Sequence, residues 1–314
     1  MTQGLAEWSS AAWVESAVSW LDDRLVAAGA ARTGPVTQPR LRAWGTVLCA
    51  PTTRGPVWLK APAPETAFEV ALYELLASVA PDRVLEPIAV DVSRGFVLLP
   101  DGGPALLDDD FTGLATMLAR YGELQRALAS HVDNLLAFGL ADMRPAAMPA
   151  RFDEALAVAH RIATADDRAA LDRIAGLRPR FDEWCARLAA SPVPASIDHN
   201  DLHAGNIFAA GTIYDWGDSV VAHSFASMLV ALGCLGFPHD DPVVARLRDA
   251  YLEPFIDLAP RAELAGEVEV ACRVGKVARA LVWERAVRLD PGDFARAPLR
   301  TLLALEAGAL SLRP

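Results

Sequence analysis

The stretch His199-Asn200-Asp201-Leu202-His203-Ala204-Gly205-Asn206 is followed, nine residues beyond its last member, by Asp215-Trp216-Gly217-Asp218. Phosphoryl transfer needs a carboxylate that orients the attacking hydroxyl, and oxygen ligands that hold magnesium on a nucleoside triphosphate. Asp201 is therefore the candidate to accept or orient the hydroxyl proton of a substrate. Asn206 and Asp215 are candidate magnesium ligands, and Gly217 would permit a close approach of the backbone.

Lys60 is a candidate phosphate-binding residue far upstream of this stretch. The chain has 29 lysines and arginines, of which only Lys60 and Lys276 are lysines. A lysine ammonium is a compact point charge that is often used to bind phosphate. Lys60 stands at the end of a β-like run, so we expect it to neutralise the α- and β-phosphates. The alternative is an ordinary lysine at the end of a strand.

The partner of Lys60 should lie on the helix that follows, which the pattern predicts from Pro64 to about Ala80. Glu65 falls near the middle of the apolar stripe of this helix, Glu69 lies at its edge, and Glu74 points away. An acidic residue in the first turn, such as Glu65, is equally explained by the helix dipole. Glu69 is thus the preferred partner, with Glu65 in reserve.

The hydrophobic periodicity predicts an α+β protein in which a small sheet with one internal helix precedes a large helical part. A helix is expected over 5–28, followed by β-like runs over 36–43, 46–50, 57–61, 88–92 and 96–99. Further helices are expected over 109–131, 151–163, 167–190, 223–236, 241–258, 261–289 and 296–311, with short strands near 206–214.

The run Pro100-Asp101-Gly102-Gly103-Pro104 is the strongest linker signal in the chain. We therefore expect a nucleotide-binding N-lobe over 1–100, a hinge over 101–107 and a helical C-lobe over 108–314. The C-lobe would carry the catalytic loop and the substrate site, and a nucleotide would lie between the lobes.

Net charge bears on the partners of the protein. The chain carries −11, which argues against nucleic acid as a partner because phosphate binding needs a basic face. Residues 196–259 hold nine acidic residues against two arginines, a net of −7. An acidic surround would attract a cationic substrate, although carboxylates that only confer solubility explain the charge equally well.

The cysteines and the apolar stretches bear on localisation. The four cysteines are scattered and lie in apolar settings, which is typical of a reduced, cytosolic protein. No secretory signal pattern opens the chain. Residues 219–238 are uncharged over nearly a membrane-spanning length, but the His, Ser and Gly residues among them favour a buried helix. A cytoplasmic protein without a membrane partner is expected.

The His-x-Asp-x-x-x-x-Asn spacing, with the later Asp-Trp-Gly, resembles the aminoglycoside phosphotransferase family, which has a protein-kinase-like, bilobal fold. The resemblance implies ATP (or GTP) and Mg²⁺ as cofactors, and an acceptor hydroxyl on a small, amine-bearing molecule such as an aminoglycoside or amino sugar. It also implies a role for each matching residue: Asp201 as catalytic base, Asn206 and Asp215 as magnesium ligands, Lys60 as the phosphate-pairing lysine, Glu69 within the family's Phe-Glu pattern, and His199 as a residue that holds the loop by hydrogen bonding.

The sequence departs from this family at several positions. Asn200 and Ala204 stand where the family usually has Gly and Pro. A Gly-x-Gly-x-x-Gly loop is missing, so the turn at Trp44 and Gly45 is the one candidate cover for the phosphates. His223 begins a His-Ser-Phe-Ala run where the family often has Pro and an Asp-Leu pair.

Two other functions remain open at this point. One is a catalytically silent nucleotide-binding protein of the same fold. The other is a zinc hydrolase that uses His199, Asp201 and His203. In the kinase interpretation, His203 and Asp218 are instead candidates for contact with the acceptor.

Overall fold

The computed structural model describes residues 3–312, which fall into two compact units. The first unit runs to Pro104 and also includes Ala210–Gly217, while the second contains Ala105–Ala209 and the chain from Asp218 onward. The short segment 210–217 joins the first unit through Ile213, whose N–H donates to the Arg83 carbonyl at 2.9 Å. This grouping, which the sequence pattern does not predict, places Asp215 in the same unit as Lys60.

The first unit is built on a five-stranded antiparallel sheet with the order β1-β2-β3-β5-β4. The register places Lys60 on β3 opposite Val47 on β2 and Val97 on β5. Lys60 is therefore held on a central strand with neighbours on both sides. The strands are β1 (Thr37–Arg42), β2 (Gly45–Thr52), β3 (Gly55–Pro62), β4 (Ala89–Asp91) and β5 (Phe96–Pro100).

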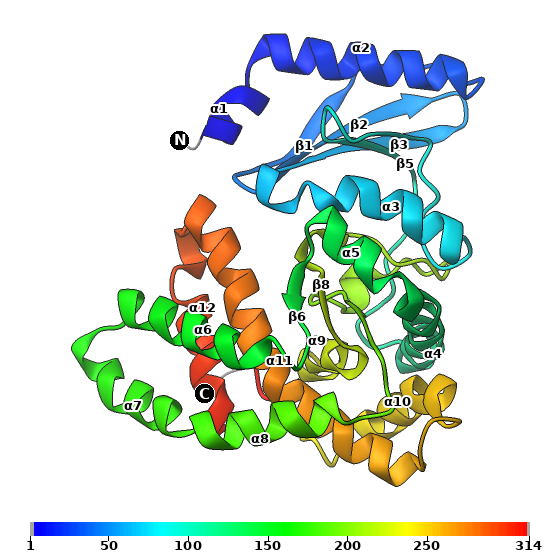
Figure 1. Cartoon of the computed structure of the whole chain (residues 1–314). Helices are drawn as coiled ribbons and strands as arrows, with labels where there is room; N and C mark the ends of the chain where they lie inside the picture. The colour runs from blue at the N-terminus through cyan, green and yellow to red at the C-terminus, as the bar shows by residue number, and fades with distance from the viewer. Residues whose placement is uncertain (1–2, 313–314) are drawn as a thin grey trace. The chain divides into compact units, whose positions relative to one another are not determined.

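Helices α2 (Ala11–Ala27) and α3 (Phe68–Val79) lie on opposite faces of this sheet (Figure 1). On the α2 side, Leu21 and Leu25 pack with Leu59 and Ala61 of β3 in one buried cluster. Successive strand residues point to opposite faces, so Lys60, between these two residues, points to the side of α3. The pattern of β3 thus keeps its single lysine out of the α2 core.

Two helix boundaries in this unit differ from the prediction. The helix predicted over 5–28 is two helices, α1 (Gln3–Trp8) and α2, because Ser10 caps α2 by accepting a hydrogen bond from the Trp13 N–H. The helix predicted from Pro64 begins at Phe68, and a single 3-10 turn covers Pro64–Thr66. The five β-like runs are confirmed as β1 to β5.

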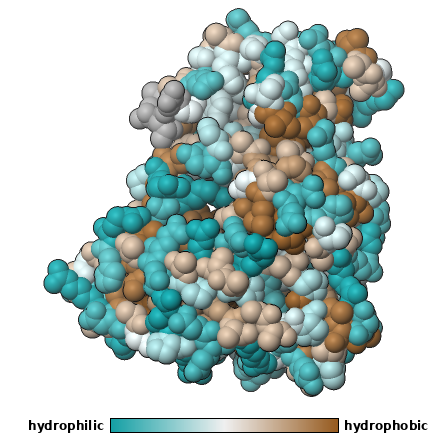
Figure 2. All heavy atoms as spheres, in the orientation of Figure 1, coloured by the Kyte–Doolittle hydropathy of each residue, from teal (hydrophilic) through white to brown (hydrophobic). Residues whose placement is uncertain are grey.

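The second unit is mainly helical, with α11 (Arg261–Leu289) buried along much of its length. Its outer helices are amphipathic, and Figure 2 shows polar side chains spread over the drawn face of α7 and α8. The remaining helices are α4 (Phe111–Leu128), α5 (Val132–Phe138), α6 (Met148–Ile162), α7 (Arg168–Gly176), α8 (Arg178–Ala189), α9 (Met228–Gly233), α10 (Pro242–Leu252) and α12 (Ala297–Leu303).

A small sheet of the order β6-β8-β7 supports the loop that follows β7. It consists of β6 (Ala141–Met143), β7 (Ala195–Asp198) and β8 (Val220–His223); β6 and β8 are parallel, and β7 and β8 antiparallel. Strand β7 ends at Asp198, immediately before His199. The 199–206 stretch therefore begins at the end of a buried strand.

Several predictions for this unit were wrong. Strands β6 and β7 and helix α5 were not predicted, and the range 167–190 is two helices because Pro179 opens α8. Of the helix expected over 223–236, only α9 is α-helical: His223 ends β8, where pairing with β7 extends the backbone, and a 3-10 turn covers Ser224–Ser227. The strands expected near 206–214 are only isolated bridges, at Phe208 and Ile213.

The predicted α+β class, with a small antiparallel sheet and a mainly helical remainder, is confirmed. Within residues 3–312, no helix has both the length and the apolar character needed to cross a membrane.

Candidate functional site

Lys60 lies at the centre of an ionic group within the first unit. Its Nζ atom is 2.6 Å from Glu69 Oε1 and 2.5 Å from Asp215 Oδ1. The side chains of Lys60, Glu69 and Asp215 are 20%, 1% and 33% exposed. The structure therefore pairs Lys60 with Glu69, while Glu65 is exposed. We refer to Lys60, Glu69 and Asp215 as the lysine group.

Electrostatics keep Lys60 charged. Burial alone would lower the pKa of Lys60, but Asp215 and Glu69 outweigh burial and raise the pKa above its ordinary value. Burial raises the pKa of Glu69, against the opposing effect of Lys60. With both carboxylates ionised, the lysine group carries one net negative charge. Arg40 Nη1 lies 3.8 Å from Asp215 Oδ2 and offsets part of that charge.

The segment that carries Asp215 approaches the lysine group closely. Asp215 has a φ of +61°, a left-handed conformation that non-glycine residues adopt mainly where the surroundings impose it. A Cβ atom on Gly217 would lie 3.3 Å from Glu69 Oε2 and 4.0 Å from Lys60 Nζ. Glycine at 217 thus lets the backbone pass beside the ion pair, as the sequence suggested.

The Trp44-Gly45 turn is fixed by packing against the end of β3. The Trp44 carbonyl accepts a hydrogen bond from the Ala63 N–H at 3.0 Å. A Cβ atom on Gly45 would lie 3.2 Å from the Ala61 carbonyl oxygen. This contact explains the glycine without a ligand, so the phosphate-covering role of Trp44 and Gly45 stays a prediction.

Asp201, the proposed hydroxyl-orienting residue, lies in the second unit and has both carboxylate oxygens engaged. Its Oδ1 atom accepts a hydrogen bond from Arg279 Nη2 at 2.7 Å, and its Oδ2 atom accepts one from Asn206 Nδ2 at 3.1 Å. The His203 Nε2 atom lies 3.6 Å from Oδ2, which is a charge–charge distance rather than a hydrogen bond. Asp201, Asn206 and His203, with Arg279, are the aspartate group.

Asp201 is held ionised by its neighbours. Burial would raise the pKa of Asp201, but His203 and the Arg279 guanidinium together lower it well below its usual range. The Asp201 carboxylate in turn raises the pKa of His203. Because Asn206 directs its amide nitrogen to Asp201, its amide oxygen points away from that carboxylate, as a metal ligand requires.

The loop before Asp201 is anchored to buried side chains. The His199 N–H donates to the Tyr121 hydroxyl at 3.0 Å, and His199 is completely buried. Asn200 has a φ of +61°, and its N–H and Nδ2 donate to the two oxygens of Asp198 at 2.8 and 3.2 Å. Ser227 also donates to Asp198. The loop-holding role of His199 stays a prediction.

Sequence reasoning missed Asp198 and Arg279. Asp198 lies just outside the motif, and its burial becomes visible only once β7 is placed in the second sheet. Arg279 had one available signal, since it interrupts the apolar run 277–282 of a long helix. A cation in such a run must find buried partners.

Asp218 is paired with two arginines. Its oxygens lie 3.1 Å from Arg279 Nη1 and 3.5 Å from Arg285 Nη2. Its charge is therefore largely compensated inside the protein. This pairing makes Asp218 a weak candidate for contact with an acceptor.

The predicted zinc alternative is not formed. No group of three or more His, Cys, Asp and Glu side chains in the described part of the chain is arranged to hold a metal ion. His199 is completely buried, whereas the His203 side chain is 39% exposed beside Asp201. The His199, Asp201 and His203 set therefore does not converge as zinc ligands would.

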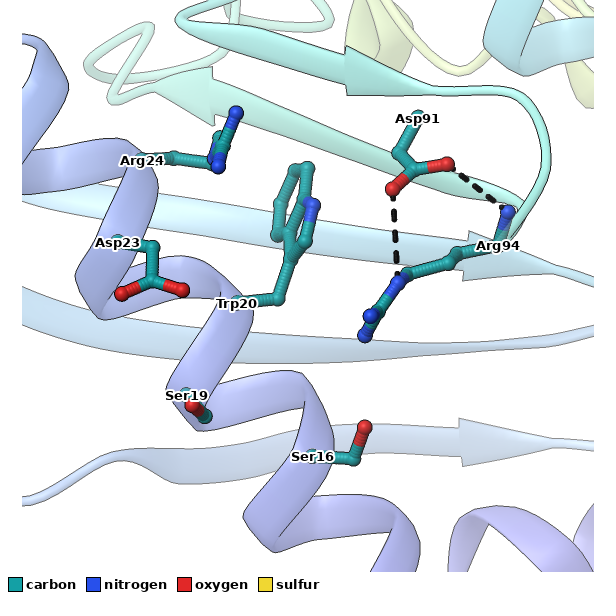
Figure 3. Close-up of a pocket in the computed structure, with 7 residues that line it drawn as sticks. All are labelled: Ser16, Ser19, Trp20, Asp23, Arg24, Asp91 and Arg94. Carbon is teal, nitrogen blue, oxygen red and sulfur yellow. Dashed lines mark hydrogen bonds and ion pairs between the residues drawn. The ribbon is translucent and has the colours of Figure 1, made fainter.

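A surface pocket of about 350 Å³ lies on the α2 side of the first unit (Figure 3). Two of its charged residues pair with each other, because the Arg94 N–H donates to Asp91 Oδ1 at 3.0 Å and Arg94 Nε lies 3.6 Å from Asp91 Oδ2. It includes none of the predicted site residues. The lining residues are Ser16, Ser19, Trp20, Asp23, Arg24, Asp91 and Arg94.

Comparison with known proteins identifies the sequence family. The sequence model described as the phosphotransferase enzyme family matches residues 54–264, which include every residue of the lysine and aspartate groups except Arg279. No curated protein sequence matches the chain.

Solved structures share the fold. A macrolide 2′-phosphotransferase type I has a TM-score of 0.59 at 17% identity, covering 94% of this chain and 97% of that one. A choline/ethanolamine kinase family protein from Mesorhizobium loti has 0.59 at 21%, covering 92% and 94%. An amicoumacin kinase, solved with AMP-PNP, Ca²⁺ and Ami, has 0.59 at 13%, covering 96% and 97%. The predicted protein-kinase-like fold is thereby confirmed.

Proposed function

We propose that this chain, which belongs to the phosphotransferase enzyme family, transfers the γ-phosphate of Mg-ATP or Mg-GTP to a small, amine-bearing molecule. Its family membership makes it a phosphotransferase with a hydroxyl group as its acceptor. The observation that carries this proposal is the lysine group. A partly buried strand lysine between two carboxylates, one of them on a close-approaching loop, is an arrangement suited to phosphate and metal binding.

We assign nucleotide binding to the lysine group. Lys60 would neutralise the α- and β-phosphates, and Glu69, fixed on α3, would hold the lysine in place. The 33% exposure of the Asp215 side chain leaves it accessible to a ligand. Trp44 and Gly45 would cover the phosphates.

Asp215 and Asn206 have the donor chemistry that magnesium prefers, a carboxylate and an amide oxygen. The partly exposed carboxylate of Asp215, and the amide oxygen of Asn206 that its contact with Asp201 leaves unused, both fit a divalent cation. When bound, the ion would neutralise charge on the phosphates. These two residues would hold it.

Asp201 would orient the hydroxyl of the acceptor. Its low pKa means that it is ionised throughout the physiological range and can accept a hydrogen bond at all times. The same low pKa makes it a weak base, so its contribution would be alignment of the nucleophile more than early removal of the proton. The partly exposed His203 is retained as an acceptor contact.

The acceptor is proposed from charge. Residues 196–259 carry a net of −7, which favours a cationic molecule over a phosphorylated or carboxylated one. Aminoglycosides, amino sugars, macrolides and small amino alcohols are the classes to screen.

The test is a transfer assay with γ-labelled ATP across these four acceptor classes, with magnesium or with EDTA. We expect label on at least one hydroxyl-bearing acceptor, only when magnesium is present. The Asp215→Asn variant should lose most of the magnesium dependence of ATP binding in calorimetry. A thermal shift with Mg-ATP, but no transfer to any acceptor, would instead identify a silent nucleotide-binding protein.

A further inference from the structure

Arg279, on α11, is a buried arginine that joins three parts of the second unit. Its Nη1 atom donates to the Asn200 carbonyl at 2.6 Å and lies 3.1 Å from Asp218 Oδ2. Its Nη2 atom donates to Asp201 Oδ1 at 2.7 Å. Only 9% of its side chain is exposed. One guanidinium therefore binds the proposed hydroxyl-orienting aspartate and the residue that precedes it.

A contact on the face of this guanidinium, in addition to the hydrogen bonds at its edge, fixes its orientation. Its Cζ atom lies 4.8 Å from the centre of the Trp283 ring, one helical turn further along α11. A planar, rigid fork of donors can hold a carbonyl and two carboxylates at once, whereas a lysine ammonium on a flexible stem cannot reproduce that geometry.

The loop conformation is matched to this contact. Asn200 has its φ of +61° while its side chain and N–H are held by Asp198. The carbonyl of Asn200 is then directed to Arg279. Asp198 therefore binds the N–H of Asn200 while Arg279 binds the carbonyl of the same residue.

We propose that Arg279 is a positioning residue for phosphoryl transfer: it fixes Oδ1 of Asp201 and the Asn200 peptide, so that the carboxylate meets the acceptor hydroxyl in a single orientation. This role rests on the proposed function. Asp218 serves as the outer anchor of the guanidinium, which accounts for the pairing that removed it from the acceptor contacts.

A purely structural role predicts different kinetics. If Arg279 only balanced buried charge, Arg279→Lys would keep the charge and should keep the rate. If it positions Asp201, the lysine variant should fold but transfer phosphate slowly, because a misplacement of about 1 Å can lower a rate about 100-fold. Binding of nucleotide and acceptor should change little in that case.

The experiment compares wild type, Arg279→Lys and Arg279→Ala, with Arg285→Lys as the matched control from the same helix and the same Asp218 partner. We expect kcat of Arg279→Lys to fall about 100-fold, with both KM values within about threefold of wild type. Arg285→Lys should stay within about threefold in kcat. Guanidinium ion at a non-denaturing concentration should restore part of the kcat of Arg279→Ala, as a readout that does not depend on the lysine variant.

Three outcomes are distinguishable. An active wild type with an equally active Arg279→Lys overturns the positioning role alone. A fall in kcat of Arg279→Lys matched by equal losses in Arg285→Lys and in thermal stability assigns Arg279 to the fold and also overturns the role. A wild type that transfers no phosphate overturns the proposed function, and the role of Arg279 falls with it.

Discussion

Lys60 and Glu69 form an ion pair in which one partner is almost completely buried. Removing one member of such a pair leaves a buried charge without compensation. We therefore expect Lys60→Met to lower the free energy of unfolding by about 3 kcal/mol, as measured by denaturant titration. The double variant Lys60→Met/Glu69→Gln should recover most of this stability.

In the double variant, nucleotide binding should be lost although stability is largely restored. The double variant restores electrical balance but has no ammonium for phosphate, so calorimetry should show little Mg-ATP binding. Glu65→Gln, at an exposed glutamate outside the lysine group, is the matched control and should still bind. Normal Mg-ATP affinity in the double variant would rule out Lys60 as the phosphate-binding residue.

His223 makes stability depend on pH through its burial. It is 3% exposed, its Nδ1 atom accepts the Phe225 N–H at 3.3 Å, and burial lowers its pKa to about 3. Glu267 faces its Nε2 atom at 3.9 Å. Below pH about 6.5 the unfolded chain takes up a proton at this histidine that the folded chain does not. Stability is therefore lost as the pH falls from about 6.5 toward 3.

The size of this effect is open to direct measurement. Between pH 7 and pH 5 the wild type should lose about 2 kcal/mol of unfolding free energy through His223. His223→Asn keeps an acceptor for the Phe225 N–H but cannot titrate, so its loss over the same range should be smaller by that amount. Parallel pH curves for the two proteins would show that His223 takes no part.

At the scale of the element, the loop between β7 and Asp201 depends on one left-handed residue, Asn200. A residue with a Cβ atom pays about 1–2 kcal/mol in this conformation, although Asn tolerates it better than most. Asn200→Gly and Asn200→Ala both lose the amide contact with Asp198. Asn200→Ala should therefore be less stable than Asn200→Gly by about 1 kcal/mol in denaturant titrations. Equal stability would mean that the loop relaxes without strain.

The left-handed conformation of Asn200 also explains why this position departs from the family pattern. Glycine is usual at this position in the aminoglycoside phosphotransferases that the sequence resembles. Asn200 can replace it because Asn enters the left-handed region readily and here gains a side-chain hydrogen bond from Nδ2 to Asp198.

The elements that the sequence predicted well are those with local signals. Strands β1 to β5 have turns between them, and α11 was predicted with its observed bounds, 261–289. Strand β8 has only the four residues Val-Val-Ala-His, a run too short for its pattern to distinguish a strand from a helix. Only pairing with β6 and β7 decides the matter, and that pairing is not encoded locally.

The site residues likewise divide into those with a local sequence signal and those without one. Lys60, Asp201, Asn206 and Asp215 could be chosen because their residue types and spacing are those of the chemistry. Arg279 could not, because its contact with Asp201 spans 78 residues of sequence and depends on how α11 packs. The membership of 210–217 in the first unit is likewise a tertiary property.

At the scale of the whole molecule, family membership establishes the type of reaction but does not identify the acceptor. The solved structures that share the fold, at 13–21% identity, include a macrolide 2′-phosphotransferase, a choline/ethanolamine kinase family protein and an amicoumacin kinase. A fold that hosts so many acceptors does not select one. In the proposed function, selection among acceptors would fall to partly exposed side chains near Asp201, such as His203.

The most direct measurement is the steady-state rate of phosphoryl transfer by Asp201→Asn beside wild type, with Mg-ATP affinity determined on the same samples. Asparagine keeps the size of the side chain and removes the charge that we propose orients the hydroxyl. We expect a kcat at least about 100-fold below wild type with an unchanged dissociation constant for Mg-ATP. Transfer at the wild-type rate by Asp201→Asn would contradict it.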